Sequence, residues 1–198
     1  MTKAILLVGV GGQGTLLASR ILSAGLVKAG YDLKMSEIHG MAQRGGSVIT
    51  QIKYGEKVYA PLVGLGEADL LIAFEKIEAL RWLPYLKDKG ILLVNDLEIY
   101  PLPVLSGKEI YPQNVEDYLQ DKVENFQLLR AHWLAGELGN YRVQNMIILA
   151  AGVKALGLEN LNWPAILAAH LPANLLEINN RAWEIGLKGE EKNASKTC

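Results

Sequence analysis

Residues 4–14 read AILLVGVGGQG, a continuous apolar run that passes directly into a cluster of glycines. An apolar run without alternation is typical of a strand buried on both faces, as in a parallel sheet. Residues 15–29 follow with apolar side chains at helical spacing, and Gly30 ends the pattern. The stretch therefore predicts a Rossmann-like start in which a buried strand, a glycine loop and a helix follow one another.

The rest of the chain repeats the alternation of strands and helices. Further strands are expected at 33–38, 47–54, 69–74 and 91–95, and one helix carries Ile77, Leu80, Leu83 and Leu86 and ends near Gly90. This order predicts the α/β class, as a three-layer α/β/α arrangement around a mostly parallel sheet.

The second half of the chain is predicted to be mainly helical. Prolines and a glycine mark residues 98–121 as a long connection, and residues 121–137 are expected to be an extended piece leading into a helix. The helical C-terminal third comprises 140–156, a helix opened by Asn162, Trp163 and Pro164, and 173–187. We expect one domain over 1–187 and a polar, flexible tail over 188–198.

Composition excludes several classes of protein. The 198 residues carry 20 Lys and Arg against 21 Asp and Glu, and the net charge of −1 argues against a general nucleic-acid binder. We find neither a signal sequence nor an apolar stretch of membrane-spanning length, so we expect a cytoplasmic protein without a membrane partner. The single cysteine, Cys198, cannot form an internal disulfide, a cysteine-rich metal site or an iron–sulfur site.

The glycine cluster matches G-x-G-x-x-G at Gly9, Gly11 and Gly14, with Gly12 and Gln13 inside it. In such loops the glycines permit a tight turn, close approach to a phosphate and close packing of helix on strand. The helix that follows offers free N–H groups and a partial positive charge to an anion. We predict a cofactor- or anion-binding loop, while the alternative is a tight turn with no ligand.

A dinucleotide site also needs an acid near the end of the second strand, and Glu37 lies there. However, residues 39–46 are too short for the crossover helix that a dinucleotide fold requires, because such a connection needs a dozen or more residues. We therefore favour an anion loop over an NAD(P) site, and an NAD(P)-dependent dehydrogenase remains the alternative.

The second candidate segment is glycine-rich as well and surrounds an arginine. Arg44 can offer a planar fork to phosphate or carboxylate, and the glycines let a ligand approach the backbone. His39 can act as a donor or acceptor near neutral pH. The candidate residues here are His39, Gly40, Met41, Gln43, Arg44, Gly45 and Gly46. The alternative is a structural loop in which Arg44 pairs with an acid.

Together the two segments resemble a known family. The motif at 9–14, followed by EIHGMAQRGGS at 37–47, is similar to the gamma-type domain of 2-oxoacid:ferredoxin oxidoreductases, most of all to the small subunit of the branch that uses indolepyruvate. Asn145 falls in a later helix that also resembles the family. Ala42 stands where many members have serine. The resemblance covers about residues 3–187.

The resemblance implies an oxidoreductase subunit with no catalytic residue of its own. The family decarboxylates a 2-oxoacid oxidatively, joins the acyl group to coenzyme A and passes electrons to ferredoxin. Thiamine diphosphate and iron–sulfur clusters are then expected on a larger partner subunit, with no cofactor bound by this chain alone. The 9–14 loop and the 39–46 segment, together with Glu37 and Asn145, would face the partner subunit and the entry of the substrate or coenzyme A. A homodimer of the isolated chain and a non-enzymatic docking module are the other expectations.

Overall fold

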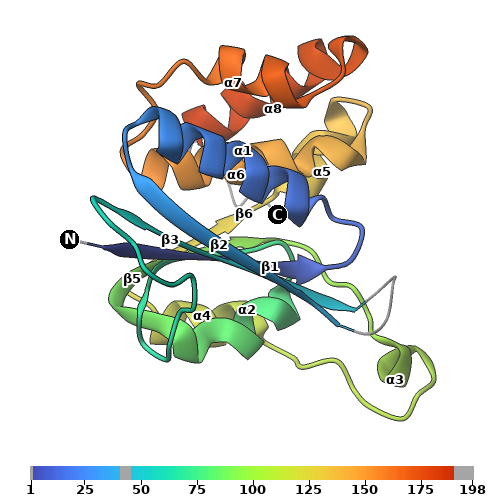
Figure 1. The fold of residues 1–198 in the computed structure, drawn as a ribbon. Helices are drawn as coiled ribbons and strands as arrows, with labels where there is room; N and C mark the ends of the chain where they lie inside the picture. Colours follow the sequence, from blue (N-terminus) through green and yellow to red (C-terminus); the bar gives the residue numbers. More distant parts are fainter. Residues whose placement is uncertain (1, 41–45, 190–198) are drawn as a thin grey trace.

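The computed structural model describes residues 2–40 and 46–189, which form a six-stranded sheet between two layers of helices (Figure 1). The strands are β1 (Lys3–Val10), β2 (Asp32–His39), β3 (Ser47–Gly55), β4 (Ala68–Ala73), β5 (Leu86–Asn95) and β6 (Asn125–Leu129). Their order is β2-β3-β1-β4-β5-β6. Only β3 runs against its neighbours, and the other pairs are parallel. The predicted mostly parallel α/β/α architecture is confirmed.

Most of the helices cover one face of the sheet. On that face α1 (Thr15–Lys28), α5 (Ala131–Glu137) and α6 (Gln144–Ala155) lie nearer the sheet, and α7 (Trp163–His170) and α8 (Leu176–Lys188) lie outside them (Figure 1). The opposite face carries α2 (Lys76–Trp82) and α4 (Val115–Lys122), while α3 (Leu102–Leu105) projects from the body. Three short 3₁₀ helices complete the described chain: η1 (Leu83–Tyr85), η2 (Tyr141–Val143) and η3 (Ala173–Leu175).

The continuous apolar run of β1 is explained by burial on both sides. Ile5 and Leu7 belong to the core under α1 and α6, whereas Leu6 and Val8 belong to the core over α2 and α4. Successive side chains of a strand point to opposite faces, so a strand covered on both faces needs apolar residues at every position. The sheet therefore separates two cores, with β1 contributing to each.

The last two helices pack against α6 and α1. A side chain at Gly186 of α8 would collide with the backbone carbonyl of Ile147 in α6. A side chain at Gly25 of α1 would likewise collide with Trp163 of α7. Because both positions lack a Cβ, the outer helices approach closely and leave α6 buried between the sheet and α8.

Two predicted elements differ from the structure. The helix expected from Ile77 to Gly90 ends at Trp82, because Pro84 lacks the N–H that a continuing helix needs, and residues 86–90 begin β5 instead. The connection predicted over 98–121 contains α4 from Val115, which the prolines before it obscured. The extended piece leading into a helix over 121–137 is confirmed as β6 and α5.

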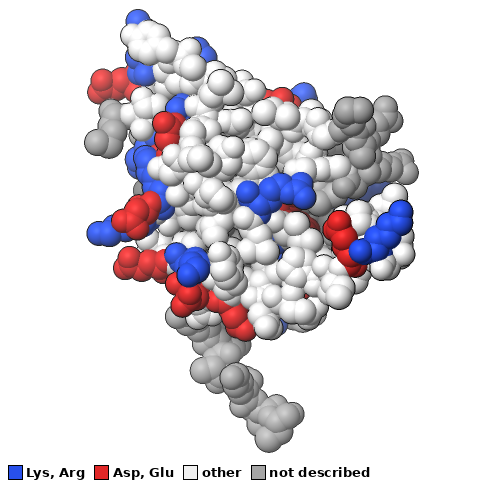
Figure 2. Space-filling view, turned by 90° about the horizontal axis from the view of Figure 1, so that it is seen from below, with Lys and Arg blue, Asp and Glu red and all other residues white. Residues whose placement is uncertain are grey.

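The C-terminal tail lies largely outside the described residues. α8 extends to Lys188 and Gly189 follows it, so residues 190–198, including Cys198, are not described. No helix in residues 2–40 and 46–189 combines the length and apolarity needed to cross a membrane. On the face that carries α2 and α4, basic and acidic side chains lie interspersed rather than in one broad patch of a single sign (Figure 2).

Candidate functional site

The glycine loop and the described ends of the second glycine-rich segment, Gly40 and Gly46, lie at the carboxyl end of β1. The loop after β1 is joined to the end of the β2–β3 hairpin by a hydrogen bond of 2.9 Å from the Gly11 N–H to the Gly46 carbonyl. Gly40 and Ser47 close the hairpin with a second backbone bond of 2.9 Å. The glycine loop and the described ends of the second segment therefore lie at one edge of the sheet, and open α/β sheets bind their ligands at this edge.

The backbone of the loop requires glycine at two positions. Gly12 and Gly14 have φ values of 102° and 78°, in the left-handed region that other residues rarely adopt. A Cβ at Gly14 would also collide with the side chain of Asn145. At Gly9 the need is space, because a Cβ there would lie 2.7 Å from the Gln13 Oε1 atom. The loop is thus held close to both α6 and its own Gln13.

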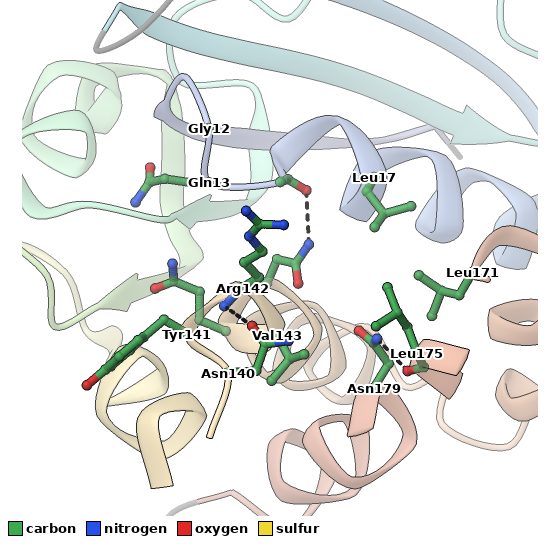
Figure 3. A pocket seen from close by; sticks show the side chains of 13 residues that line it. Gly12, Gln13, Leu17, Asn140, Tyr141, Arg142, Val143, Leu171, Leu175 and Asn179 are labelled. Carbon is green, nitrogen blue, oxygen red and sulfur yellow. Dashed lines mark hydrogen bonds between the residues drawn. The ribbon is translucent and has the colours of Figure 1, made fainter. Parts of the chain in front are cut away.

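The Gln13 side chain is used within the fold. Its Oε1 atom accepts a hydrogen bond of 2.6 Å from the Val10 N–H, and its Nε2 atom donates one of 2.8 Å to the Phe74 carbonyl. Figure 3 shows this side chain directed away from the cavity beside the loop. These bonds tie the loop to the end of β4. Any ligand contact by Gln13 would therefore come from its backbone.

A cavity of about 370 Å³ lies between this loop and α6 (Figure 3). It is lined by the loop and α1, by the start of α6 with η2, and by the segment that leads into α8. The lining residues are Gly12, Gln13, Gly14, Leu17, Asn140, Tyr141, Arg142, Val143, Gln144, Asn145, Leu171, Leu175 and Asn179. This volume falls within the range of small-ligand sites.

Asn145 joins two walls of the cavity. Its Nδ2 atom donates a hydrogen bond of 3.4 Å to the Gly14 carbonyl, which holds the start of α6 against the glycine loop. The resemblance singled out this residue, and the structure places it beside the loop. Arg142, Gln144 and Asn179 were not anticipated. For Arg142 and Gln144 the signal was a polar segment directly before the apolar residues of α6, whereas Asn179 lies within α8 and had no such signal.

The charge of the cavity favours an anion. The first helical bond of α1 joins the Ala18 N–H to the Gly14 carbonyl, so the N–H groups of residues 15–17 have no partner within the helix. Arg142 is exposed, and its guanidinium group extends toward the glycine loop in Figure 3. None of the described residues that line the cavity is an Asp or Glu. This arrangement supports the predicted anion-binding loop.

Glu37 and His39 lie on the sheet-edge strand β2 and do not line this cavity. Ser19 Oγ donates a hydrogen bond of 3.3 Å to Glu37 Oε1, and His39 Nε2 lies 3.9 Å from Glu37 Oε2. β3 separates β2 from β1, whereas a dinucleotide fold pairs its second strand with its first. Glu37 therefore lacks the position of a ribose-binding acid. Met41, Gln43, Arg44 and Gly45 lie outside the described residues.

A second cavity of about 380 Å³ opens at the same sheet edge, on the face that carries α2. Glu75 is 1% exposed and accepts three hydrogen bonds, from the Tyr111 hydroxyl (2.7 Å), the Glu78 N–H (3.0 Å) and the Ile99 N–H (3.3 Å). Burial and the Glu75 carboxylate raise the pKa of the Tyr111 hydroxyl.

Glu78 is the other buried acid of this second cavity. It accepts a hydrogen bond from Ser47 Oγ and forms an ion pair of 3.1 Å with Arg81 Nη1. Burial raises the pKa of Glu78. Within residues 2–40 and 46–189, no group of three or more His, Cys, Asp or Glu residues is arranged to hold a metal ion.

Comparison with known proteins agrees with this geometry. Residues 4–189 match the family model described as pyruvate ferredoxin/flavodoxin oxidoreductase. The match spans nearly the whole chain, so the chain belongs to this family and is a subunit of a 2-oxoacid:ferredoxin oxidoreductase.

The chain is similar to indolepyruvate oxidoreductase subunit IorB of Thermococcus kodakarensis, with 35% identity over 95% of this chain and 96% of the relative. It is also similar to IorB of Methanothermobacter thermautotrophicus, with 35% identity over 94% of this chain and 96% of the relative. The solved gamma subunit of a keto/oxoacid ferredoxin oxidoreductase from Geobacter sulfurreducens has the same fold, with a TM-score of 0.70, 20% identity and 95% coverage of both chains.

Proposed function

We propose that this chain is the small subunit of an enzyme that oxidatively decarboxylates indolepyruvate, transfers the acyl group to coenzyme A and reduces ferredoxin. Relatives named for indolepyruvate match about 95% of the chain at 33–35% identity. The common gamma subunit of the pyruvate/ketoisovalerate oxidoreductases of Thermococcus kodakarensis matches 77% of the chain at 26% identity. The difference supports indolepyruvate as the 2-oxoacid.

Within that enzyme, the role we propose for this chain is to position coenzyme A or the substrate. The observation that carries the proposal is the cavity beside the glycine loop, where Arg142 and the first turn of α1 offer positive charge without an acid or a nucleophile and base pair. Such a site can orient a reactant but cannot break its bonds. Arg44, Gly45 and Gly46 stay predicted binding residues, and the first two lie outside the described residues.

The redox and thiamine cofactors belong, in this proposal, to a larger partner subunit. An iron–sulfur cluster needs several thiolates, and the chain offers only Cys198. The described residues also provide no carboxylate cluster for the metal ion that would accompany a diphosphate cofactor. The residues present therefore do not fit these groups. Electrons would reach ferredoxin through the partner, in the cytoplasm.

A surface for that partner is supported by the segment around α3. Its apolar side chains are unusually exposed: Leu102 by 77%, Leu105 by 69% and Ile110 by 87%. Exposed apolar residues that lie close together commonly mark protein contacts. In the proposed complex, α3 and the nearby hairpin end would contact the larger subunit. The same residues could pair two copies of the isolated chain.

The test is an assay of indolepyruvate oxidation with coenzyme A and a redox dye. The chain alone, the larger subunit alone and the two together are compared, with pyruvate as the alternative substrate. We expect turnover only in the mixture and a preference for indolepyruvate. Substantial turnover by this chain alone would contradict the positioning role, and a preference for pyruvate would contradict the choice of 2-oxoacid.

A further inference from the structure

A buried asparagine determines how one amide of the cavity is oriented. Asn95, at the end of β5, is 0% exposed, and its Oδ1 atom accepts a hydrogen bond of 3.2 Å from the His132 N–H. Because its oxygen accepts from a backbone donor, its Nδ2 atom must be the side that faces Gln144 and the Phe74 carbonyl, at 3.1 and 3.3 Å.

The orientation of Asn95 determines that of Gln144. Gln144 Oε1 accepts a hydrogen bond from Asn95 Nδ2. The same oxygen atom lies 3.2 Å from His132 Nδ1, so it has two contacts within the fold. With the oxygen occupied, the donor end of the amide, Nε2, lies on the other side. Gln144 is only 8% exposed, and the surface that it does expose lines the cavity beside the glycine loop. Its Nε2 atom is thus available as a buried donor to a ligand.

Three kinds of donor converge on this cavity. They are the first-turn N–H groups of α1, the guanidinium group of Arg142 and the Nε2 atom of Gln144. The helix formed by η2 and α6 also begins here, so a second helix end adds partial positive charge. Leu17, Leu171 and Leu175 form an apolar wall beside these donors.

From this convergence we infer that the cavity binds the phosphate group of an organic phosphate ester, with Arg142 supplying the charge and Gln144, oriented by Asn95, a neutral donor. Phosphate oxygens accept several hydrogen bonds and favour helix N-termini and arginine. The apolar wall suits the organic part of an ester. The inference rests on the proposed function to the extent that coenzyme A, which carries a diphosphate and a 3′-phosphate, is the expected source.

Calorimetric titration of the full chain tests this inference. The probes are inorganic pyrophosphate, coenzyme A, dephospho-coenzyme A and pantetheine, each at low and at high potassium chloride. The variants are Arg142→Gln and Gln144→Glu, and Arg20→Gln is the matched control, because Arg20 is exposed on α1 and does not line the cavity. Thermal melting establishes that each variant is folded.

The wild-type chain is expected to bind pyrophosphate and coenzyme A, more weakly at high salt, and not to bind pantetheine. Arg142→Gln is expected to weaken both ligands about tenfold, the usual loss for one charge-assisted contact. Gln144→Glu keeps the acceptor for Asn95 but places a carboxylate in the cavity, so it should weaken binding at least as much. Arg20→Gln should change affinity less than about twofold. If dephospho-coenzyme A binds more weakly than coenzyme A, the group held in the cavity is the 3′-phosphate. If the two bind equally well, the group held there is the diphosphate.

The inference is overturned if the folded wild type binds neither pyrophosphate nor coenzyme A, or if both cavity variants bind them like the wild type. Its failure is separable from that of the proposed function. Turnover of indolepyruvate by the complex, with an unchanged KM for coenzyme A in Arg142→Gln, would leave the proposed function standing and refute this site. If pyrophosphate binding depends on Arg142 but the complex does not turn over indolepyruvate, the phosphate site stands and the proposed function is refuted.

Discussion

The two cavities at the carboxyl edge of the sheet differ in the charge that they present. The cavity beside α1 and α6 carries Arg142 and uncapped helix N–H groups, with no acid among its described lining residues. The cavity beside α2 carries the buried carboxylates of Glu75 and Glu78. Both lie next to the end of β1, so the sheet separates a site that attracts anions from one that repels them.

The difference lies in whether the polar groups already have partners. The oxygens of Glu75 accept bonds from Tyr111, Glu78 and Ile99, and Glu78 is bonded to Ser47 and Arg81. These acids hold α2, the following loop and the start of β3 together. In the other cavity, the donors of α1 and Gln144 are left for a ligand. Polar groups that are bonded within the fold therefore indicate a structural role in one cavity, and donors left without a partner in the fold indicate binding in the other.

The largest expected effect is the loss of Glu75. Glu75→Ala removes the cap of α2 and leaves the Tyr111 hydroxyl and the Ile99 N–H without their acceptor, which should destabilise the fold by about 3 kcal/mol. Urea unfolding measures this free energy. Glu98→Ala is the control, because Glu98 is exposed and its ion pair within the described residues is with Lys76, so its loss should cost at most about 1 kcal/mol. Equal losses in the two variants would contradict a structural role for the buried acid.

A smaller effect is expected at the glycine loop. Gly14→Ala forces alanine to adopt a φ of 78° and brings its Cβ against the Asn145 side chain. The free energy of unfolding should fall by about 2 kcal/mol. Gly66→Ala has a similar φ of 67° but meets nothing within 4 Å, so it reports the backbone strain alone, about 1 kcal/mol. The difference between the two unfolding free energies isolates the contact with α6. No difference would mean that the loop and α6 are not held together as described.

The smallest effect is a pH dependence at Glu78. Its pKa is raised by burial above the ordinary value of 4.5, so the folded state holds this proton at a higher pH than the unfolded chain does. The resulting stabilisation is complete below about pH 4.5 and is lost as the pH rises through the folded pKa. Glu78→Gln stays neutral, so its unfolding free energy relative to the wild type should increase as the pH is raised over that range.

Ser47→Ala sharpens this test. The Ser47 hydroxyl lowers the pKa of Glu78, so its removal should move the loss of stability to higher pH. Denaturant midpoints of the three proteins between pH 4 and pH 8 provide the comparison. A difference between Glu78→Gln and the wild type that does not change with pH would show that burial does not perturb this acid.

The start of the fold could be predicted from local sequence because its signals are local. The apolar run of β1, the glycines and the spacing in residues 15–29 fall within one continuous stretch, and the structure has β1, the loop and α1 there. Residues 39–46 are too few for a crossover helix, which indicated that the next strand follows directly. The pairing of β3 with β1 was not predictable, because the partner of a strand is decided by long-range packing rather than by its own residues.

The site was predictable only in part for the same reason. Gly12 and Gly14 can be recognised from their motif, but nothing in the motif indicated that the amide of Gln13 would be bonded to Val10 and Phe74. Arg142 and Gln144 lie about 130 residues from the loop in sequence, and only the packing of α6 brings them to it. Cys198, the single cysteine of the sequence, excludes an internal disulfide and is one ground for the proposal that electrons pass through a partner subunit.

Hydrogen–deuterium exchange on the complex with the larger subunit, with and without coenzyme A, tests the central claim most directly. Coenzyme A is expected to slow exchange in peptides covering residues 11–17 and 140–145, which border the cavity beside α1, and to leave residues 75–81 and 99–105 unchanged. Protection confined to residues 75–81 and 99–105, or absent from both cavities while turnover proceeds, would contradict it.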